Sequence, residues 1–88
     1  MKSTATPRFW ALLNALPPEI QKLAEKNFHL WLKDPHHPSL QFKRLKGAGD
    51  RFSVRVGSHY RAIAWRPSPD TVQWLWIGSH ADYDSLLS

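Results

Sequence analysis

The stretch that most constrains the fold is RFSVRVGSHYRAIAW, residues 51–65. Apolar and polar residues alternate through its first half, which is typical of a β-strand with one buried face. A glycine, Gly57, opens the interruption at residues 57–59 and suits a tight hairpin loop, which places Arg55 opposite Arg61. The predicted core face carries Phe52, Val54, Val56, Tyr60, Ala62 and Ala64. The opposite face carries Arg51, Ser53, Arg55, Arg61, Ile63 and Trp65.

Further strands are indicated on both sides of this hairpin. VQWLWIG, residues 72–78, is rich in aromatic and β-branched residues and follows the turn RPSPD, so it predicts a strand antiparallel to residues 60–66. SLQFKRL, residues 39–45, alternates and predicts a short strand, and residues 2–7 add a possible further one.

The N-terminal half reads as a helical hairpin. Phe9, Leu12, Leu13 and Leu16 share one helical stripe, and LPPE ends that helix and begins another, with Pro18 suited to the first turn. The second helix ends at KDPHHP, because a residue before proline is disfavoured in a helix. We therefore predict an α+β fold: the two helices pack on one face of a small antiparallel sheet. A short helix or turn over residues 81–87, anchored by Leu86 and Leu87, completes the chain.

Composition narrows the class of protein. The length of 88 residues predicts a single domain, residues 1–88, and a hydrophobic content of 42% is enough for a compact core. Without cysteine, neither disulfides nor thiolate metal sites can hold the fold. We find no apolar signal region and no stretch approaching the ~18 apolar residues of a membrane span, so we expect a cytoplasmic protein without membrane contact.

The net charge of +5 predicts a polyanionic partner. Seven of the twelve basic residues fall between positions 43 and 66. A basic sheet edge exposed to solvent is the alternative explanation, but the recurrence of arginine on one strand face favours a binding surface.

A polar cluster follows the last predicted strand, in WIGSHADYDSLL, residues 76–87. Antiparallel pairing brings the end of that strand beside Arg61, so His80 emerges near Arg61 and Arg55, and Tyr83 follows one helical turn later. Two guanidiniums, a histidine and a tyrosine suit metal-free RNA cleavage, in which fixed positive charge stabilises the phosphorane and histidine moves a proton. The alternatives are that His80 lies at a helix start without a chemical role, that Tyr83 packs in the core, and that the arginines pair with Asp82 or Asp84.

Three segments carry a resemblance to a known family: FKRLKG, SVRVGSHYRAI and WIGSHADYD, in that order. The sequence resembles the RelE/ParE superfamily of bacterial toxin–antitoxin toxins over residues 9–87, with the RelE/YafQ-like branch favoured. The resemblance implies a RelE-like fold and a metal-independent, ribosome-dependent mRNA endonuclease without a cofactor. It implies two partners, a cognate antitoxin and mRNA on the ribosome, and a toxin that is monomeric when free.

The resemblance also assigns residues. Arg55, Arg61, His80 and Tyr83 match the positions expected to be catalytic, with His80 as the acid/base residue. The residues expected to bind RNA are Lys43, Arg44, Lys46, Arg51, Ser53 and His59. Ser53 and His80 depart from the pattern, because some members place a lysine and an arginine there. Asp82 and Asp84 lie close to His80 in the sequence, and either they orient its imidazole or they are surface charges. His36 and His37 sit in a proline-bounded loop without a third ligand nearby, so no metal site is predicted.

Two other functions remain open from the sequence. A ParE-like member would inhibit DNA gyrase by binding and would need no nuclease site, although the histidine after Ile77-Gly78 argues against it. A nucleic-acid-binding relic without activity is the third reading.

Overall fold

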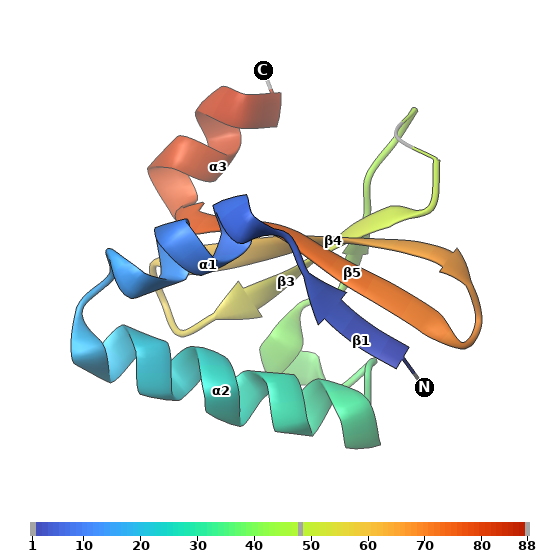
Figure 1. The fold of residues 1–88 in the computed structure, drawn as a ribbon, viewed down its shortest axis with the longest axis horizontal. Coiled ribbons are helices and arrows are strands. Elements are labelled where there is room, and N and C mark those ends of the chain that lie inside the picture. The colour runs from blue at the N-terminus through green and yellow to red at the C-terminus, as the bar shows by residue number, and fades with distance from the viewer. Residues whose placement is uncertain (1, 48, 88) are drawn as a thin grey trace.

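The computed structural model describes residues 2–47 and 49–87, which form a five-stranded sheet with helices against both of its faces (Figure 1). The strands lie in the order β1-β5-β4-β3-β2. Their bounds are β1 Lys2–Ala5, β2 Lys43–Arg44, β3 Arg51–Val56, β4 Tyr60–Ser68 and β5 Thr71–Ser79. The helices are α1 Pro7–Asn14, α2 Pro18–Lys33 and α3 His80–Leu87, with a short 3-10 helix, η1, at Pro38–Leu40. The predicted α+β class is confirmed.

The central hairpin has the predicted register. Arg55 pairs with Arg61 and Val56 with Tyr60 across β3 and β4. Gly57 turns the chain with a φ of +66°, and a Cβ there would lie 2.6 Å from Cδ2 of Leu23 on α2. Both the positive φ and the packing of α2 therefore require glycine at this position.

The sheet is mixed, and the prediction of an antiparallel sheet was wrong at one edge. The possible strand at residues 2–7 is present as β1, which pairs with β5 in parallel, with Ser3 beside Val72. Hairpin loops join β3, β4 and β5, so those pairs are antiparallel, whereas β1 and β5 are separated by nearly the whole chain and no tight turn sets their direction.

The helical hairpin begins and ends at local signals in the sequence. The Thr6 hydroxyl caps α1 by accepting a hydrogen bond from the Phe9 N–H at 3.1 Å. Pro18 opens α2, which ends at Lys33, one residue before the Asp34-Pro35 bond, as predicted. No helix within residues 2–47 and 49–87 is long and apolar enough to cross a membrane.

The segment predicted as a strand at residues 39–45 is mostly not one. It forms η1, followed by the two-residue strand β2, because Gln41 adopts a left-handed conformation with a φ of 43°. Leu40 is buried beneath this turn, and Phe42 stacks on Phe52 with ring centroids 5.0 Å apart. The alternation of apolar and polar residues therefore arises because Leu40 and Phe42 each pack into the core separately, and not because the segment is a continuous strand.

Side chains pack into one cluster on each face of the sheet. The larger cluster lies under α1 and α2, where Trp31 stacks on Phe52 at 5.7 Å and Trp74 meets both rings edge-on. The smaller cluster holds Ile63, Trp76 and Tyr83. A register shift in β5 separates the two tryptophans, since Ile63 pairs with Trp76 and Ala64 with Trp74. Both tryptophans are buried, but on opposite faces of the sheet.

Helix α3 begins at His80 directly after β5, and its anchor differs from the prediction. Leu86 and Leu87, expected to fix the segment, are 48% and 47% exposed. Tyr83 is buried instead, against Trp76 and Ile63. The leucine prediction was wrong because α3 turns its Tyr83 side toward the sheet, which leaves the last turn in solvent.

Candidate active site

The candidate site lies where β4 begins and β5 ends. Arg61 pairs with Gly78, and Tyr60 pairs with Ser79, the residue before His80. Because Arg61 also pairs with Arg55, the backbone brings three of the predicted catalytic positions to one end of the sheet. The His80 N–H donates to the His59 carbonyl at 2.7 Å, which ties the start of α3 to the loop between β3 and β4. The pairing that the sequence predicted is therefore present in the backbone.

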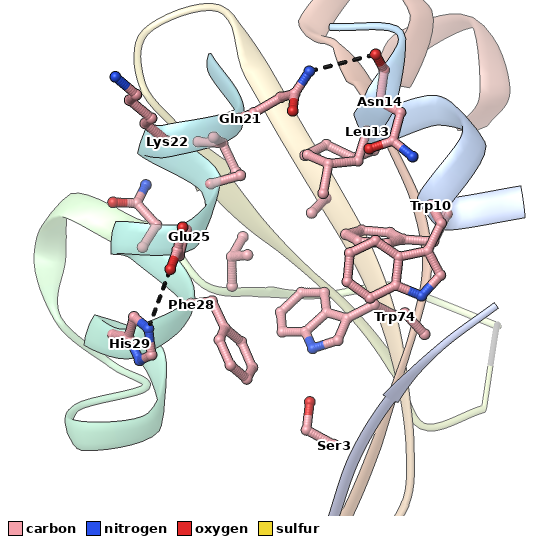
Figure 2. A pocket seen from close by; sticks show the side chains of 18 of the residues that line it. Ser3, Trp10, Leu13, Asn14, Gln21, Lys22, Glu25, Phe28, His29 and Trp74 are labelled. Carbon is pink, nitrogen blue, oxygen red and sulfur yellow. Dashed lines mark hydrogen bonds and ion pairs between the residues drawn. The ribbon is translucent and has the colours of Figure 1, made fainter. Parts of the chain in front are cut away.

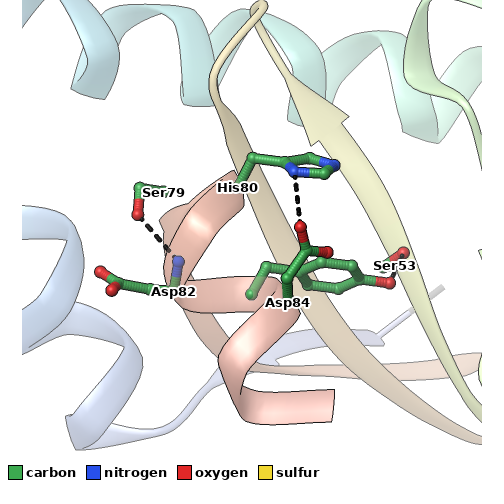
Figure 3. A network of polar contacts seen from close by, with 6 residues as sticks. Ser53, Ser79, His80, Asp82 and Asp84 are labelled. Atoms are coloured by element: carbon green, nitrogen blue, oxygen red, sulfur yellow. Dashed lines mark hydrogen bonds and ion pairs between the residues drawn. The ribbon is translucent and has the colours of Figure 1, made fainter. Parts of the chain in front are cut away.

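His80 and Asp84 form an ion-pair contact on the exposed side of α3. Nδ1 of His80 lies 3.2 Å from Oδ2 of Asp84, and their side chains are 57% and 65% exposed. Figure 3 shows the Asp84 carboxylate reaching toward the imidazole, while Asp82 lies on the other side of the helix. The Asp82 backbone N–H donates a hydrogen bond to the Ser79 hydroxyl at 3.1 Å. Of the two aspartates, Asp84 is the one placed to act on His80.

Arg61 is buried beneath α3 rather than open to solvent. The exposed fractions of Arg61, Ser53 and Tyr83 are 5%, 0% and 4%. Nη2 of Arg61 donates to Ser53 Oγ at 2.9 Å and to the Gln41 carbonyl at 2.8 Å. The Tyr83 ring lies over the guanidinium, 5.2 Å from centroid to Cζ, and its hydroxyl is 3.0 Å from Ser53 Oγ. We call Ser53, Arg61 and Tyr83 the buried triad.

The buried triad links four parts of the chain. Ser53 comes from β3, Arg61 from β4, Tyr83 from α3 and the Gln41 carbonyl from the turn after η1. Hydrogen bonds that satisfy a buried charge are needed for its burial to be tolerated. The triad thus fixes how α3 packs on the sheet. Its three side chains, which the sequence assigned to catalysis or RNA contact, contact one another in the interior.

Arg55 lies nearer to solvent than its strand partner. It is half-buried, and its Nε donates to the Gly57 carbonyl at 2.7 Å. The Arg55 carbonyl accepts a hydrogen bond from Asn27 on α2 at 3.1 Å, which holds the strand against the helix. Arg55 is therefore held through both its side chain and its backbone carbonyl, and it is less buried than Arg61.

The predicted RNA-contact residues fall into two groups. Lys43, Arg44, Lys46 and Arg51 are exposed on or beside β2 and the start of β3, and His59 is exposed at the hairpin loop. Ser53 differs from them because it is fully buried in the triad. Part of the basic surface predicted from the charge distribution is therefore exposed, but Arg61 is buried and Arg55 and Arg66 are half-buried. Ser53 contacts Arg61 and Tyr83 in the interior.

Sequence reasoning missed some contacts that position the site. It gave no role to the Gln41 carbonyl or to Asn27, and no sequence signal marks a backbone carbonyl as a partner of a distant arginine. It did not decide whether Asp82 and Asp84 orient His80 or are only surface charges, although the spacing of four residues along a helix between His80 and Asp84 was a usable signal. Within the residues the structure describes, no three His, Asp or Glu side chains come together as a metal site.

A groove opens on the other face of the sheet, between α1, α2 and β1 (Figure 2). It has a volume of about 650 Å³, with Phe28 and Trp74 among its lining residues and the half-exposed Trp10 at its α1 side. The indole N–H of Trp74 is buried, and among the described residues it has no hydrogen-bond partner. Lys22 and Glu25 add charge along the α2 side.

Comparisons with known proteins identify the family. A family model described as the ParE-like toxin domain matches residues 18–85. No curated protein sequence matches the chain.

Solved structures share the fold. A chain of the RelB–RelE antitoxin–toxin complex from Methanococcus jannaschii superimposes with a TM-score of 0.75 at 17% identity, covering 97% of this chain and 99% of that one. YafQ from E. coli gives a TM-score of 0.76 at 9% identity, with coverages of 93% and 96%. The YoeB/ParE toxin from Agrobacterium tumefaciens gives 0.74 at 15%, with coverages of 91% and 99%. The chain therefore belongs to the ParE-like toxin domain family, within the RelE/ParE superfamily that its motifs resemble.

Proposed function

We propose that this protein is the toxin of a type II toxin–antitoxin pair and cleaves mRNA on the ribosome in the cytoplasm, without a metal. The observation that carries the proposal is the exposed His80–Asp84 pair directly after β5, at the end of the sheet where Arg55 lies near the end of β3, on the far side of β4. A histidine oriented by a carboxylate can act as a general acid or base, and fixed positive charge can stabilise the transition state of phosphodiester cleavage. The family membership supports the toxin part of this proposal.

In the proposed reaction the 2′-oxygen of the RNA attacks the adjacent phosphorus. His80 moves the proton, and Arg55 binds the non-bridging oxygens, since a guanidinium can contact two phosphate oxygens at once. Arg61 adds positive charge from beneath the site, where burial weakens solvent screening. Tyr83 covers Arg61, and its ring centroid lies 5.9 Å from that of His80, so it supports the imidazole from the α3 side.

The exposed basic residues provide the surface that follows the RNA backbone. Lys43, Arg44, Lys46 and Arg51 lie together at the β2 edge, and His59 lies at the loop beside His80. Binding through such contacts weakens with added salt, because each neutralised phosphate releases counterions. This surface also suits an acidic partner segment, which would cover it when the toxin is silenced.

The proposed silencing partner is a cognate antitoxin with an amphipathic segment. The apolar groove beside α1 and α2 and the exposed Leu86 and Leu87 offer surface for its apolar side, and the basic residues offer surface for its acidic side. Antitoxin–toxin complexes occur among proteins of this fold, as in the RelB–RelE complex from Methanococcus jannaschii.

A second candidate function is inhibition of DNA gyrase by binding, which membership of the ParE-like toxin domain family also allows. A binding inhibitor has no need for an oriented imidazole, so the His80–Asp84 pair argues for the nuclease.

Two assays separate the functions. The protein and its His80→Ala variant are induced in bacterial cells and growth is followed, with His29→Ala as the control, because His29 is an exposed histidine on α2. We expect growth arrest by the wild type and by His29→Ala, and relief by His80→Ala with the fold intact by circular dichroism. Purified protein is also added to a gyrase supercoiling assay. Strong inhibition of supercoiling, with arrest by His80→Ala as complete as by the wild type, would overturn the nuclease in favour of the gyrase inhibitor.

A further inference from the structure

The His80–Asp84 contact fixes more than the position of an imidazole. Nδ1 of His80, and not Nε2, is the ring nitrogen that lies 3.2 Å from the Asp84 carboxylate. We infer that Asp84 is a positioning residue that holds neutral His80 in the tautomer with its proton on Nδ1, so that Nε2 is the base toward the 2′-hydroxyl. This inference rests on the proposed function and deepens it by assigning the direction of proton transfer.

The chemistry of the two groups dictates the tautomer. An ionised carboxylate only accepts hydrogen bonds, so a neutral imidazole can bond to it through Nδ1 only if that nitrogen carries the proton. Nε2 then holds a lone pair and no hydrogen. A partner on one ring nitrogen commonly sets the role of the other in this way.

The surroundings favour Asp84 for this role over other carboxylates. The His80 backbone is fixed by its N–H bond to the His59 carbonyl, so the side chain starts from a defined point. Asp84 lies four residues after His80 on the same helix, so the geometry of α3 itself holds the two side chains next to each other. Asp82 lies on the other side of α3, beside Ser79 (Figure 3).

A second pair of a histidine and a carboxylate, on α2, serves as a comparison for His80 and Asp84. His29 and Glu25 are also four residues apart on a helix, but Nε2 of His29 is 4.0 Å from the Glu25 oxygen. That separation is too long for a hydrogen bond. His29 is exposed, as His80 is. It therefore shows which tautomer an exposed histidine adopts when a carboxylate is nearby but too far away for a hydrogen bond.

The proton and electron pairs balance in this scheme. Nε2 of His80 takes the 2′-hydroxyl proton as the 2′-oxygen bonds to phosphorus, and the bond between phosphorus and the 5′-oxygen breaks. The leaving 5′-oxygen takes a proton from solvent water, and the resulting hydroxide takes the proton back from Nε2. The RNA ends carry a 2′,3′-cyclic phosphate and a 5′-hydroxyl, and His80 returns to its starting tautomer.

The tautomer can be measured without any activity. Two-bond nitrogen–proton correlation spectra of ¹⁵N-histidine-labelled protein, recorded above neutral pH, distinguish a protonated Nδ1 from a protonated Nε2. We expect His80 to show the Nδ1–H form and His29 a mixture. Asp84→Asn offers an amide that both donates and accepts, so it removes the preference at His80, whereas the control Asp82→Asn leaves it unchanged.

Cleavage is then measured with mRNA on programmed ribosomes at saturating and limiting toxin. Because the pair is exposed, we expect the contact between the neutral imidazole and the carboxylate to change the rate by about 5-fold at most, which corresponds to about 1 kcal/mol. We expect Asp84→Asn to lower kcat about 5-fold with little change in KM, and Asp82→Asn to match the wild type.

The outcomes separate this inference from the proposed function. A His80 that shows the same tautomer in wild type and Asp84→Asn, or an Asp84→Asn variant that cleaves at the wild-type rate, overturns the role of Asp84 and leaves the nuclease standing. A wild-type protein that shows no cleavage overturns the nuclease and the catalytic use of the tautomer together. An Nδ1–H form lost in Asp84→Asn, together with the drop in kcat, supports the inference.

Discussion

Replacing Tyr83 by phenylalanine tests whether the buried triad holds α3 on the sheet. The change keeps the ring over Arg61 and against Trp76 and removes only the hydroxyl that lies 3.0 Å from Ser53 Oγ. A hydrogen bond contributes about 0.5–1.5 kcal/mol net, and a buried group left without a partner costs about 1–3 kcal/mol. Since Ser53 keeps its bond from Arg61, we expect the free energy of unfolding to fall by about 1–2 kcal/mol. In a domain of this size that lowers Tm by roughly 4–15 °C.

Ser53→Ala and the double variant Ser53→Ala/Tyr83→Phe complete a double-mutant cycle with Tyr83→Phe. Ser53→Ala removes a partner from both Tyr83 and the Arg61 guanidinium, so we expect a larger loss of about 2–4 kcal/mol, because a buried charged donor is left short of an acceptor. The double variant should lose less than the sum of the two single losses by about 1 kcal/mol, since both remove the same bond. Equilibrium urea unfolding followed by tryptophan fluorescence gives all three values. Additive losses, or a Tyr83→Phe variant as stable as the wild type, would refute the network and leave apolar packing alone to hold α3.

Two further predictions concern stability. Gly47→Ala and Gly57→Ala both place alanine at a positive φ, which costs about 1–2 kcal/mol. Gly57→Ala should lose about 1 kcal/mol more, because its Cβ forces Leu23 from its rotamer; equal losses by thermal unfolding would exclude that contact. The Leu86→Ser/Leu87→Ser variant should change the free energy of unfolding by no more than about 0.5 kcal/mol per site, since both side chains are exposed. A loss of several kcal/mol would instead show these leucines to be the anchors of α3.

The central hairpin and its neighbour were predictable because their signals are local. The alternation over residues 51–56 and the glycine at position 57 determine which residues face each other, and the structure has Arg55 opposite Arg61. The same parity placed the end of β5 beside Arg61, where Gly78 is found. Helix ends at prolines were equally readable, because the proline ring restricts its own backbone and that of the preceding residue.

The burial of Arg61 was not predictable from these patterns. Strand parity puts Arg61 on the face away from α2, and an arginine on such a face is normally solvated. Its burial depends on α3 folding back with Tyr83 over the guanidinium, and on a carbonyl supplied by Gln41 in an unusual conformation. These are tertiary contacts between segments far apart in the chain, and no periodicity encodes them.

The same reason explains the error at the last turn of the chain. Two adjacent leucines suggested an anchor, but one turn of helix can bury only one side, and Tyr83 takes the sheet-facing position. The parallel pairing of β1 likewise depends on where the helical hairpin returns the chain, which composition cannot show.

The most direct test of the central claim is to map the 5′ ends of cellular mRNAs by primer extension after brief induction. Wild-type protein, His80→Ala and the control His29→Ala are compared in the same cells. The account predicts new ends inside translated reading frames for the wild type and for His29→Ala, and their absence for His80→Ala. Growth arrest by the wild type with no new ends in any translated message, or the same ends with His80→Ala, would contradict it.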